Sequence, residues 1–133
     1  MAQATRTHRV GRTVTDVPEV ISEPVRIPVP GGKVIDEFVG RASTSDGAVS
    51  VARMAAPAGW SEPGQAPEFD EVTLVLSGSV VVEHRDGRLE VPAGQAVLTR
   101  AGEWVRYSVG PDGADYVAVC LPAFAPEAAH RDE

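Results

Sequence analysis

Residues 59–78 read GWSEPGQAPEFDEVTLVLSG, a stretch in which a Gly/Pro-rich loop runs directly into an apolar segment. The β-branched and apolar residues from Val72 to Leu76 predict a strand, because such side chains pack well on a pleated surface. Glu71 is the acid at the start of that strand. We therefore expect the loop to deliver a carboxylate into a buried strand, with the rest of the chain arranged around it.

The spacing of this stretch matches the first sequence motif of cupins. That motif places Gly, His, His, Glu and Gly at fixed intervals, and the same positions here hold Gly59, Gln65, Pro67, Glu71 and Gly78. The second cupin motif, with Gly, Pro, Gly, His and Asn, falls on Gly94, Arg100, Gly102, Val105 and Val109. The chain thus resembles the cupin superfamily in the spacing of these motif positions, while both motifs lack their histidines. It is also similar, over a shorter match, to the cupin-type ethanolamine-utilisation proteins.

The resemblance covers roughly residues 34–122 and implies an all-β fold. The expected architecture is a single-domain cupin, a double-stranded β-helix or jelly-roll barrel. Composition agrees, since 133 residues suffice for one domain, and 13 Gly and 11 Pro indicate frequent turns. Residues 1–13 are polar and without periodicity, so we expect a flexible N-terminal tail there and a cupin domain over residues 14–133.

Turn signals at short intervals divide the chain into short strands. The strands expected between them span residues 34–42, 48–55, 70–76, 79–85, 88–91, 95–99, 104–109 and 115–121. Asp86-Gly87 is the strongest hairpin signal, and Ser77-Gly78 and Pro111-Asp112-Gly113 are further predicted turns. The prolines of residues 14–30 favour extended pieces along a sheet edge. Residues 126–132 are either a short helix or irregular.

Charge and cysteine content limit the classes of partner. The formal charge of −7 leaves an acidic body that repels phosphate backbones, so we expect no nucleic-acid partner. Cys120 is the only cysteine, which excludes an internal disulfide and fits a reducing compartment. No segment is apolar over the length that a bilayer requires, so we expect a cytoplasmic protein without a membrane partner.

Side-chain alternation predicts the interior face of the barrel, with the register that the cupin frame implies. The residues expected to point inward are Gln65, Phe69, Glu71, Thr73, Val75, Glu103, Val105 and Tyr107. Val72, Leu74 and Leu76 lie on the opposite face and are also apolar. That face should be covered either by the chain's own second sheet and N-terminal segment or by another subunit. Cupins commonly dimerise, so the resemblance implies a homodimer.

The residues at the cupin metal-ligand positions argue against a metal ion. Such a site needs three imidazoles and one carboxylate, and only the carboxylate position, Glu71, is filled. The histidines are His8, His84 and His130, all outside the motifs. We therefore expect no metal and no cofactor. A site with unusual ligands, built from Glu68, Glu71 and Glu103 or from His130, is the alternative.

Glu71 is then the main candidate for chemistry. Burial in an apolar barrel disfavours the charged form of a carboxylate and raises its pKa, so that Glu71 could give or take a proton near neutral pH. An ion pair between Glu71 and Arg53 or Arg106 is the structural alternative. Tyr107 is the second candidate catalytic residue. The candidate substrate-binding residues are Trp60, Gln65, Phe69, Thr73, Glu103 and Val105.

Three hypotheses of function follow from these residues. The first is a metal-independent isomerase, cyclase or lyase in which Glu71 transfers a proton to or from a small molecule. The second is a non-catalytic small-molecule binding protein or sensor that uses the same pocket. The third is a metal-dependent cupin enzyme with non-standard ligands.

Overall fold

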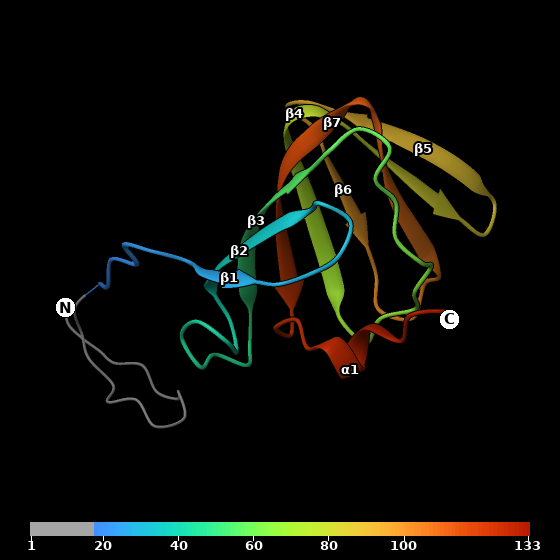
Figure 1. Ribbon diagram of the computed structural model, residues 1–133. Helices are drawn as coiled ribbons and strands as arrows, with labels where there is room; N and C mark the ends of the chain where they lie inside the picture. Colours follow the sequence, from blue (N-terminus) through green and yellow to red (C-terminus); the bar gives the residue numbers. More distant parts are fainter. Residues whose placement is uncertain (1–17) are drawn as a thin grey trace.

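The chain forms an antiparallel β-barrel with a short helix across one end, as the computed structural model shows for residues 18–133 (Figure 1). The tail predicted over residues 1–13 lies outside the described residues. The elements in chain order are β1 (Val25–Ile27), β2 (Val34–Val39), β3 (Ser50–Ala56), β4 (Asp70–His84), β5 (Gly87–Pro92), β6 (Ala96–Thr99), β7 (Val105–Leu121) and α1 (Pro126–Ala129).

The two long strands, β4 and β7, hold the barrel together. The strand order is β1-β2-β3-β7-β4-β5, and β6 pairs with β4. The first half of β4 lies between β6 and the end of β7, whereas its second half lies between β5 and the start of β7. The all-β, single-domain jelly-roll architecture expected from the sequence is confirmed.

Two of the predicted turns are bends within continuous strands. β4 runs through Ser77-Gly78 and β7 runs through Pro111-Asp112-Gly113, with register shifts in the β4–β7 pairing next to Gly78. Gly78 has φ +72°, and a Cβ built on it would lie 2.0 Å from the Gly113 carbonyl oxygen. A glycine at positive φ suits a β-bulge as well as a turn, which is why the sequence signal was misleading.

The predicted hairpin between β4 and β5 is confirmed, one residue earlier than expected. His84 pairs with Gly87, so Arg85 and Asp86 are the two loop residues. In the proline-rich segment, β1 pairs only with β2 and lies at the sheet edge, as the prolines predict. Residues 126–129 form the short helix α1. In residues 18–133, no helix combines the length and apolarity that crossing a bilayer demands.

Alternate residues of β4 face the interior in the predicted register. Glu71, Thr73 and Val75 are buried, whereas Leu74 and Leu76 are 42% and 48% exposed on the outer face. Within residues 18–133 the chain leaves Leu74 and Leu76 on that outer face exposed, so no second sheet of this part of the chain covers them. Coverage of that face by a second copy of the chain stays a prediction.

Candidate functional site

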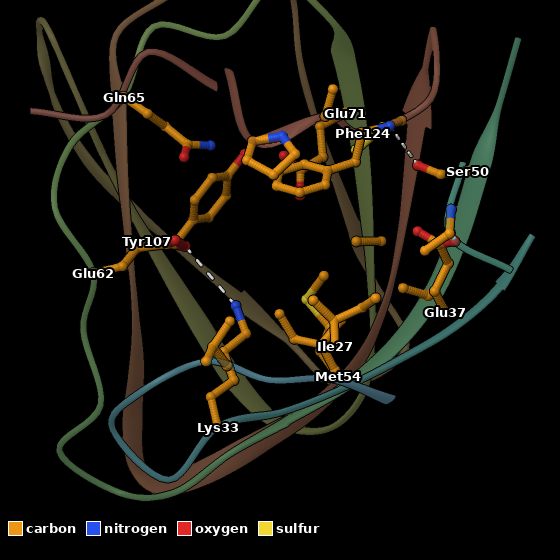
Figure 2. Close-up of a pocket in the computed structure, with 18 of the residues that line it drawn as sticks. Ile27, Lys33, Glu37, Ser50, Met54, Glu62, Gln65, Glu71, Tyr107 and Phe124 are labelled. Carbon is orange, nitrogen blue, oxygen red and sulfur yellow. Dashed lines mark hydrogen bonds and ion pairs between the residues drawn. The ribbon is translucent and has the colours of Figure 1, made fainter. Parts of the chain in front are cut away.

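The barrel encloses a cavity of about 540 Å³, which lies within the usual size of small-molecule sites. Strands β2, β3, β4 and β7 contribute to its wall, together with residues of the segment after β7 such as Phe124 and Arg131. That segment, with α1, lies across one end of the barrel (Figure 1). Apolar side chains such as Ile27, Ile35 and Met54 line one part of it. Figure 2 shows that Glu62, Gln65 and Tyr107 lie on the side opposite Glu37 and Ser50.

Glu71 contributes its carboxyl group to the cavity wall from the start of β4. The residue is 9% exposed, and burial raises its pKa to about 7, with the nearby Glu62 carboxylate adding to the shift. Lys33 and Arg131 act in the opposite direction. In residues 18–133, no hydrogen bond or ion pair reaches this carboxyl group.

The ion pair between Glu71 and Arg53 or Arg106, the structural alternative to proton transfer, is not formed. Arg53 pairs instead with Asp115 at 3.3 Å, and Arg106 pairs with Glu83 at 3.5 Å. Both arginines are on the outside of the barrel, with side chains 58% and 45% exposed. Glu71 is therefore a buried acid without a fixed partner among the described residues.

A second carboxylate, Glu62, lies between two of the cations that line the cavity, Lys33 and Arg131. Its Oε1 lies 3.9 Å from Lys33 Nζ, and its Oε2 lies 3.5 Å from Arg131 Nη2 (Figure 2 shows the Lys33 pair). Arg131 Nε also donates to Gln65 Oε1 at 3.2 Å. Gln65 is thus held by the C-terminal segment, and its amide points into the cavity in Figure 2.

Tyr107 connects the cavity wall to the backbone of Glu71. Its hydroxyl lies 3.1 Å from Thr99 Oγ1, and Thr99 Oγ1 donates to the Glu71 carbonyl oxygen at 3.4 Å. Since the single Thr99 proton is used in that bond, Tyr107 is the donor to Thr99. Burial raises the pKa of Tyr107, so the phenol stays neutral and keeps its proton.

Glu37, in contrast, is a buried carboxylate with backbone partners. It is 5% exposed, and its Oε2 accepts hydrogen bonds from the amides of Ala42 at 3.0 Å and Ser43 at 2.8 Å. The turn passes so close that a Cβ on Gly40 would lie 2.7 Å from Glu37 Cδ. This glutamate fastens the loop after β2 to the sheet.

Four of the eight candidate site residues line the cavity: Gln65, Glu71, Thr73 and Tyr107. The other four do not. Phe69 packs edge-on against Phe124 with ring centroids 5.7 Å apart, and Val105 is part of the hydrophobic core. Trp60 is buried beneath Lys33, and Glu103 Oε1 accepts from the Arg100 amide at 2.7 Å in an exposed turn. Alternation along a strand predicts which side chains point inward, but it does not tell whether such a side chain packs in the core or lines the cavity.

The residues at the cupin ligand positions do not fit a metal ion. Gln65 is engaged by Arg131, Pro67 has no donor atom, and Val105 is apolar. The alternative ligands are dispersed, because Glu68 pairs with His130 and Glu103 caps a turn. Residues 18–133 contain no group of three His, Cys, Asp or Glu side chains that could hold a metal.

Comparisons with known proteins agree with the fold and with the presence of a ligand cavity. Residues 58–132 match the family described as the AraC-like ligand binding domain. A protein of Myxococcus xanthus (strain DK1622) named endoribonuclease YbeY is 50% identical over 107 residues, which cover 80% of this chain and 36% of that protein. The chain therefore spans about a third of the length of this relative.

Among solved structures, the chain is similar to three cupin barrels at low identity. Oxalate decarboxylase of Bacillus subtilis matches with a TM-score of 0.70 and 15% identity over 84% of this chain and 30% of that chain. A variant of Streptomyces PAC13 with uridine matches with a TM-score of 0.69 and 15% identity, covering 86% and 88% of the two chains. KdgF of Halomonas sp. matches with a TM-score of 0.64 and 12% identity, covering 75% and 89%. These likenesses concern the fold.

Proposed function

From the premise that the chain belongs to the AraC-like ligand-binding domain family of the cupin superfamily, we propose that it is a metal-independent enzyme. In this proposal the cavity binds a small organic molecule, and Glu71 transfers a proton to or from it. The reaction class is isomerisation, cyclisation or elimination, in each of which one group can remove a proton and return it elsewhere.

The proposal depends mainly on the environment of the Glu71 carboxyl group. This carboxyl group lines the cavity without a fixed partner among the described residues, and its pKa is raised to about 7. Both protonation states are therefore populated near neutral pH, which is the condition for efficient general acid–base catalysis. A carboxylate held by an ion pair would remain charged and would transfer protons poorly.

The surrounding groups support a ligand that is partly apolar. Ile27, Ile35 and Met54 offer apolar contacts, while the Gln65 amide can bind a carbonyl or hydroxyl group. Tyr107 lines the same cavity as a neutral phenol. The uridine in the PAC13 structure supports a ligand of up to nucleoside size, since that barrel has the same fold.

The test begins with ligand identification and continues with a variant. Native mass spectrometry and a thermal-shift screen of metabolites should yield a compound that binds in the cavity. Glu71→Gln keeps the shape of the side chain and removes its titratable proton. We expect ligand affinity to change little and turnover to fall by about a hundredfold or more. Glu68→Gln, an exposed glutamate outside the cavity, is the matched control and should retain full turnover.

The second candidate function is a non-catalytic binding protein or sensor. The family description itself favours this alternative, because it names ligand binding and no reaction. The two candidates separate in one experiment: a bound compound that the wild-type protein leaves unchanged, under all pH values between about 5 and 9, would exclude the enzyme and retain the sensor.

A further inference from the structure

Lys33 is the only lysine in the sequence, which contains eleven arginines. It follows the Gly31-Gly32 turn and precedes β2, and its side chain is only 7% exposed. An arginine would satisfy a purely electrostatic need at such a position and is the cation this chain uses elsewhere. Lysine differs because its amine can lose its proton and act as a nucleophile, which a guanidinium cannot do in proteins.

The Lys33 amine lies at the cavity wall among aromatic rings. Nζ is 4.2 Å from the centroid of Trp60 and 5.6 Å from that of Tyr116. Its acidic neighbour Glu62 is 3.9 Å away, which is beyond the range of a hydrogen bond. Figure 2 shows the Lys33 side chain in the lower part of the view, extending into the cavity toward Glu62. The amine is therefore placed near a ligand without being held by a short ionic contact.

Burial leaves the Lys33 amine easier to deprotonate than in water. Burial lowers the pKa of Lys33, and Arg131 acts in the same direction, whereas Glu62 and Glu71 oppose the shift. The net direction is downward. Desolvation in a largely apolar pocket is a recognised way to activate an amine as a nucleophile.

We propose that Lys33 is a covalent anchor that forms a Schiff base with an aldehyde or ketone bound in the cavity. The inference rests on the proposed function in two respects, because the cavity must admit a small molecule and Glu71 must be able to give a proton. It assigns the substrate class, a carbonyl compound with an apolar body, and it makes Lys33 the residue that bonds to the substrate while Glu71 donates a proton.

The chemistry balances with the groups that line the cavity. The lone pair of neutral Nζ forms a bond to the carbonyl carbon, and the carbonyl π pair moves to the oxygen. That oxygen receives one proton from the amine and one from the Glu71 carboxyl group, and it leaves as water. The product is a protonated imine on Lys33, and Glu71 is left as a carboxylate in the same cavity. No oxidant or reductant takes part in this step.

Reductive trapping tests the proposal directly. The 133-residue chain is incubated at pH 7 with butanal and sodium cyanoborohydride, which reduces an imine to a stable secondary amine. After cleavage at arginine, Lys33 lies in the peptide of residues 27–41. We expect one butyl group on this peptide, with a rate that saturates with butanal and exceeds the rate for the chain unfolded in guanidinium chloride by tenfold or more.

The controls separate this proposal from the proton-transfer proposal. Lys33→Arg, or Lys33→Met if the first variant melts early, should show no adduct outside the N-terminal amine. Glu71→Gln should still trap butanal at Lys33, about tenfold more slowly. Equal trapping by Glu71→Gln and wild type would show that Glu71 does not supply the proton in imine formation, and it would keep the anchor. Modification of folded Lys33 no faster than in the unfolded chain, or none at all, would overturn the anchor.

Discussion

Glu37 and Glu71 mark two regions of the same cavity and differ in one respect. Both are buried glutamates that line the cavity, 5% and 9% exposed, on strands β2 and β4, which β3 and β7 separate in the sheet. The Glu37 carboxylate accepts two backbone hydrogen bonds, whereas the described residues offer none to the Glu71 carboxylate. Burial alone therefore does not distinguish the structural carboxylate, Glu37, from the candidate catalytic one, Glu71. The difference is that hydrogen-bond donors compensate the burial of Glu37 and not that of Glu71.

The largest effect that sharpens this comparison is expected at Glu37. Both amides donate to Oε2, so Glu37→Gln keeps an acceptor oxygen at that position and removes the negative charge that strengthens the two hydrogen bonds. We expect the free energy of unfolding to fall by about 3 kcal/mol, since a hydrogen bond to a charged group contributes about 1.5–3 kcal/mol and a neutral one about 1 kcal/mol. Chemical denaturation at pH 7 measures this loss.

The matched control for Glu37 is the same substitution at Glu83, an exposed partner of Arg106. Glu83→Gln should change the free energy of unfolding by less than about 1 kcal/mol, as for other exposed pairs. Equal losses for the two variants would show that the hydrogen bonds of Glu37 do not stabilise the loop.

The opposite sign is expected for the same substitution at Glu71. The carboxyl group has a pKa of about 7 in the folded protein and an ordinary value of 4.5. Below pH 4.5 both states bind the proton, and between these values only the folded state keeps it. Stability therefore falls as pH rises through this range and levels off above pH 7.

Glu71→Gln should remove this dependence on pH. The difference in free energy of unfolding between variant and wild type should be near zero at pH 4.5 and reach about 3 kcal/mol, in favour of the variant, at about pH 8. Thermal melting across this range gives the measurement. A variant less stable than wild type at pH 8 would mean that Glu71 has a compensating partner, and the contrast with Glu37 would disappear.

The smallest effect is expected at Glu103, a carboxylate that has a backbone donor but is exposed. Glu103→Ala loses the hydrogen bond from the Arg100 amide and should lower the free energy of unfolding by about 0.5–1 kcal/mol. Because Glu103 does not line the cavity, ligand affinity should not change. Calorimetric titration with a cavity ligand measures the affinity. A loss of affinity in Glu103→Ala would mean that Glu103 contributes to ligand binding after all.

Local patterns predicted the fold and the acid of the site, because both depend on residues close together in sequence. The cupin spacing located the loop and β4, and alternation placed Glu71 and Thr73 on the inner face. The same alternation could not place Phe69, which is buried in a separate cluster with Cys120 and Ala129. Whether an inward side chain meets a neighbour or an open cavity is decided by the opposite wall.

The charged neighbours of Glu71 were beyond local reasoning. Lys33 comes before β2 and Arg131 comes after α1, and only closure of the barrel brings them to Glu62. No periodicity marks Lys33, because it lies outside the strand. One signal was available in the composition, namely a single lysine in a chain whose other basic residues are arginines.

The position of β7 sets the order in which the cavity is completed. It is the last strand of the barrel to be synthesised, although it lies between β3 and β4 and pairs with both. Pairs such as Ser50 with Cys120 join residues far apart in sequence, and contacts of this kind form slowly during folding. Until β7 inserts, Glu71 remains hydrated and keeps its ordinary acidity. Uptake of one proton near pH 6 during refolding is therefore a kinetic signal for the docking of this strand.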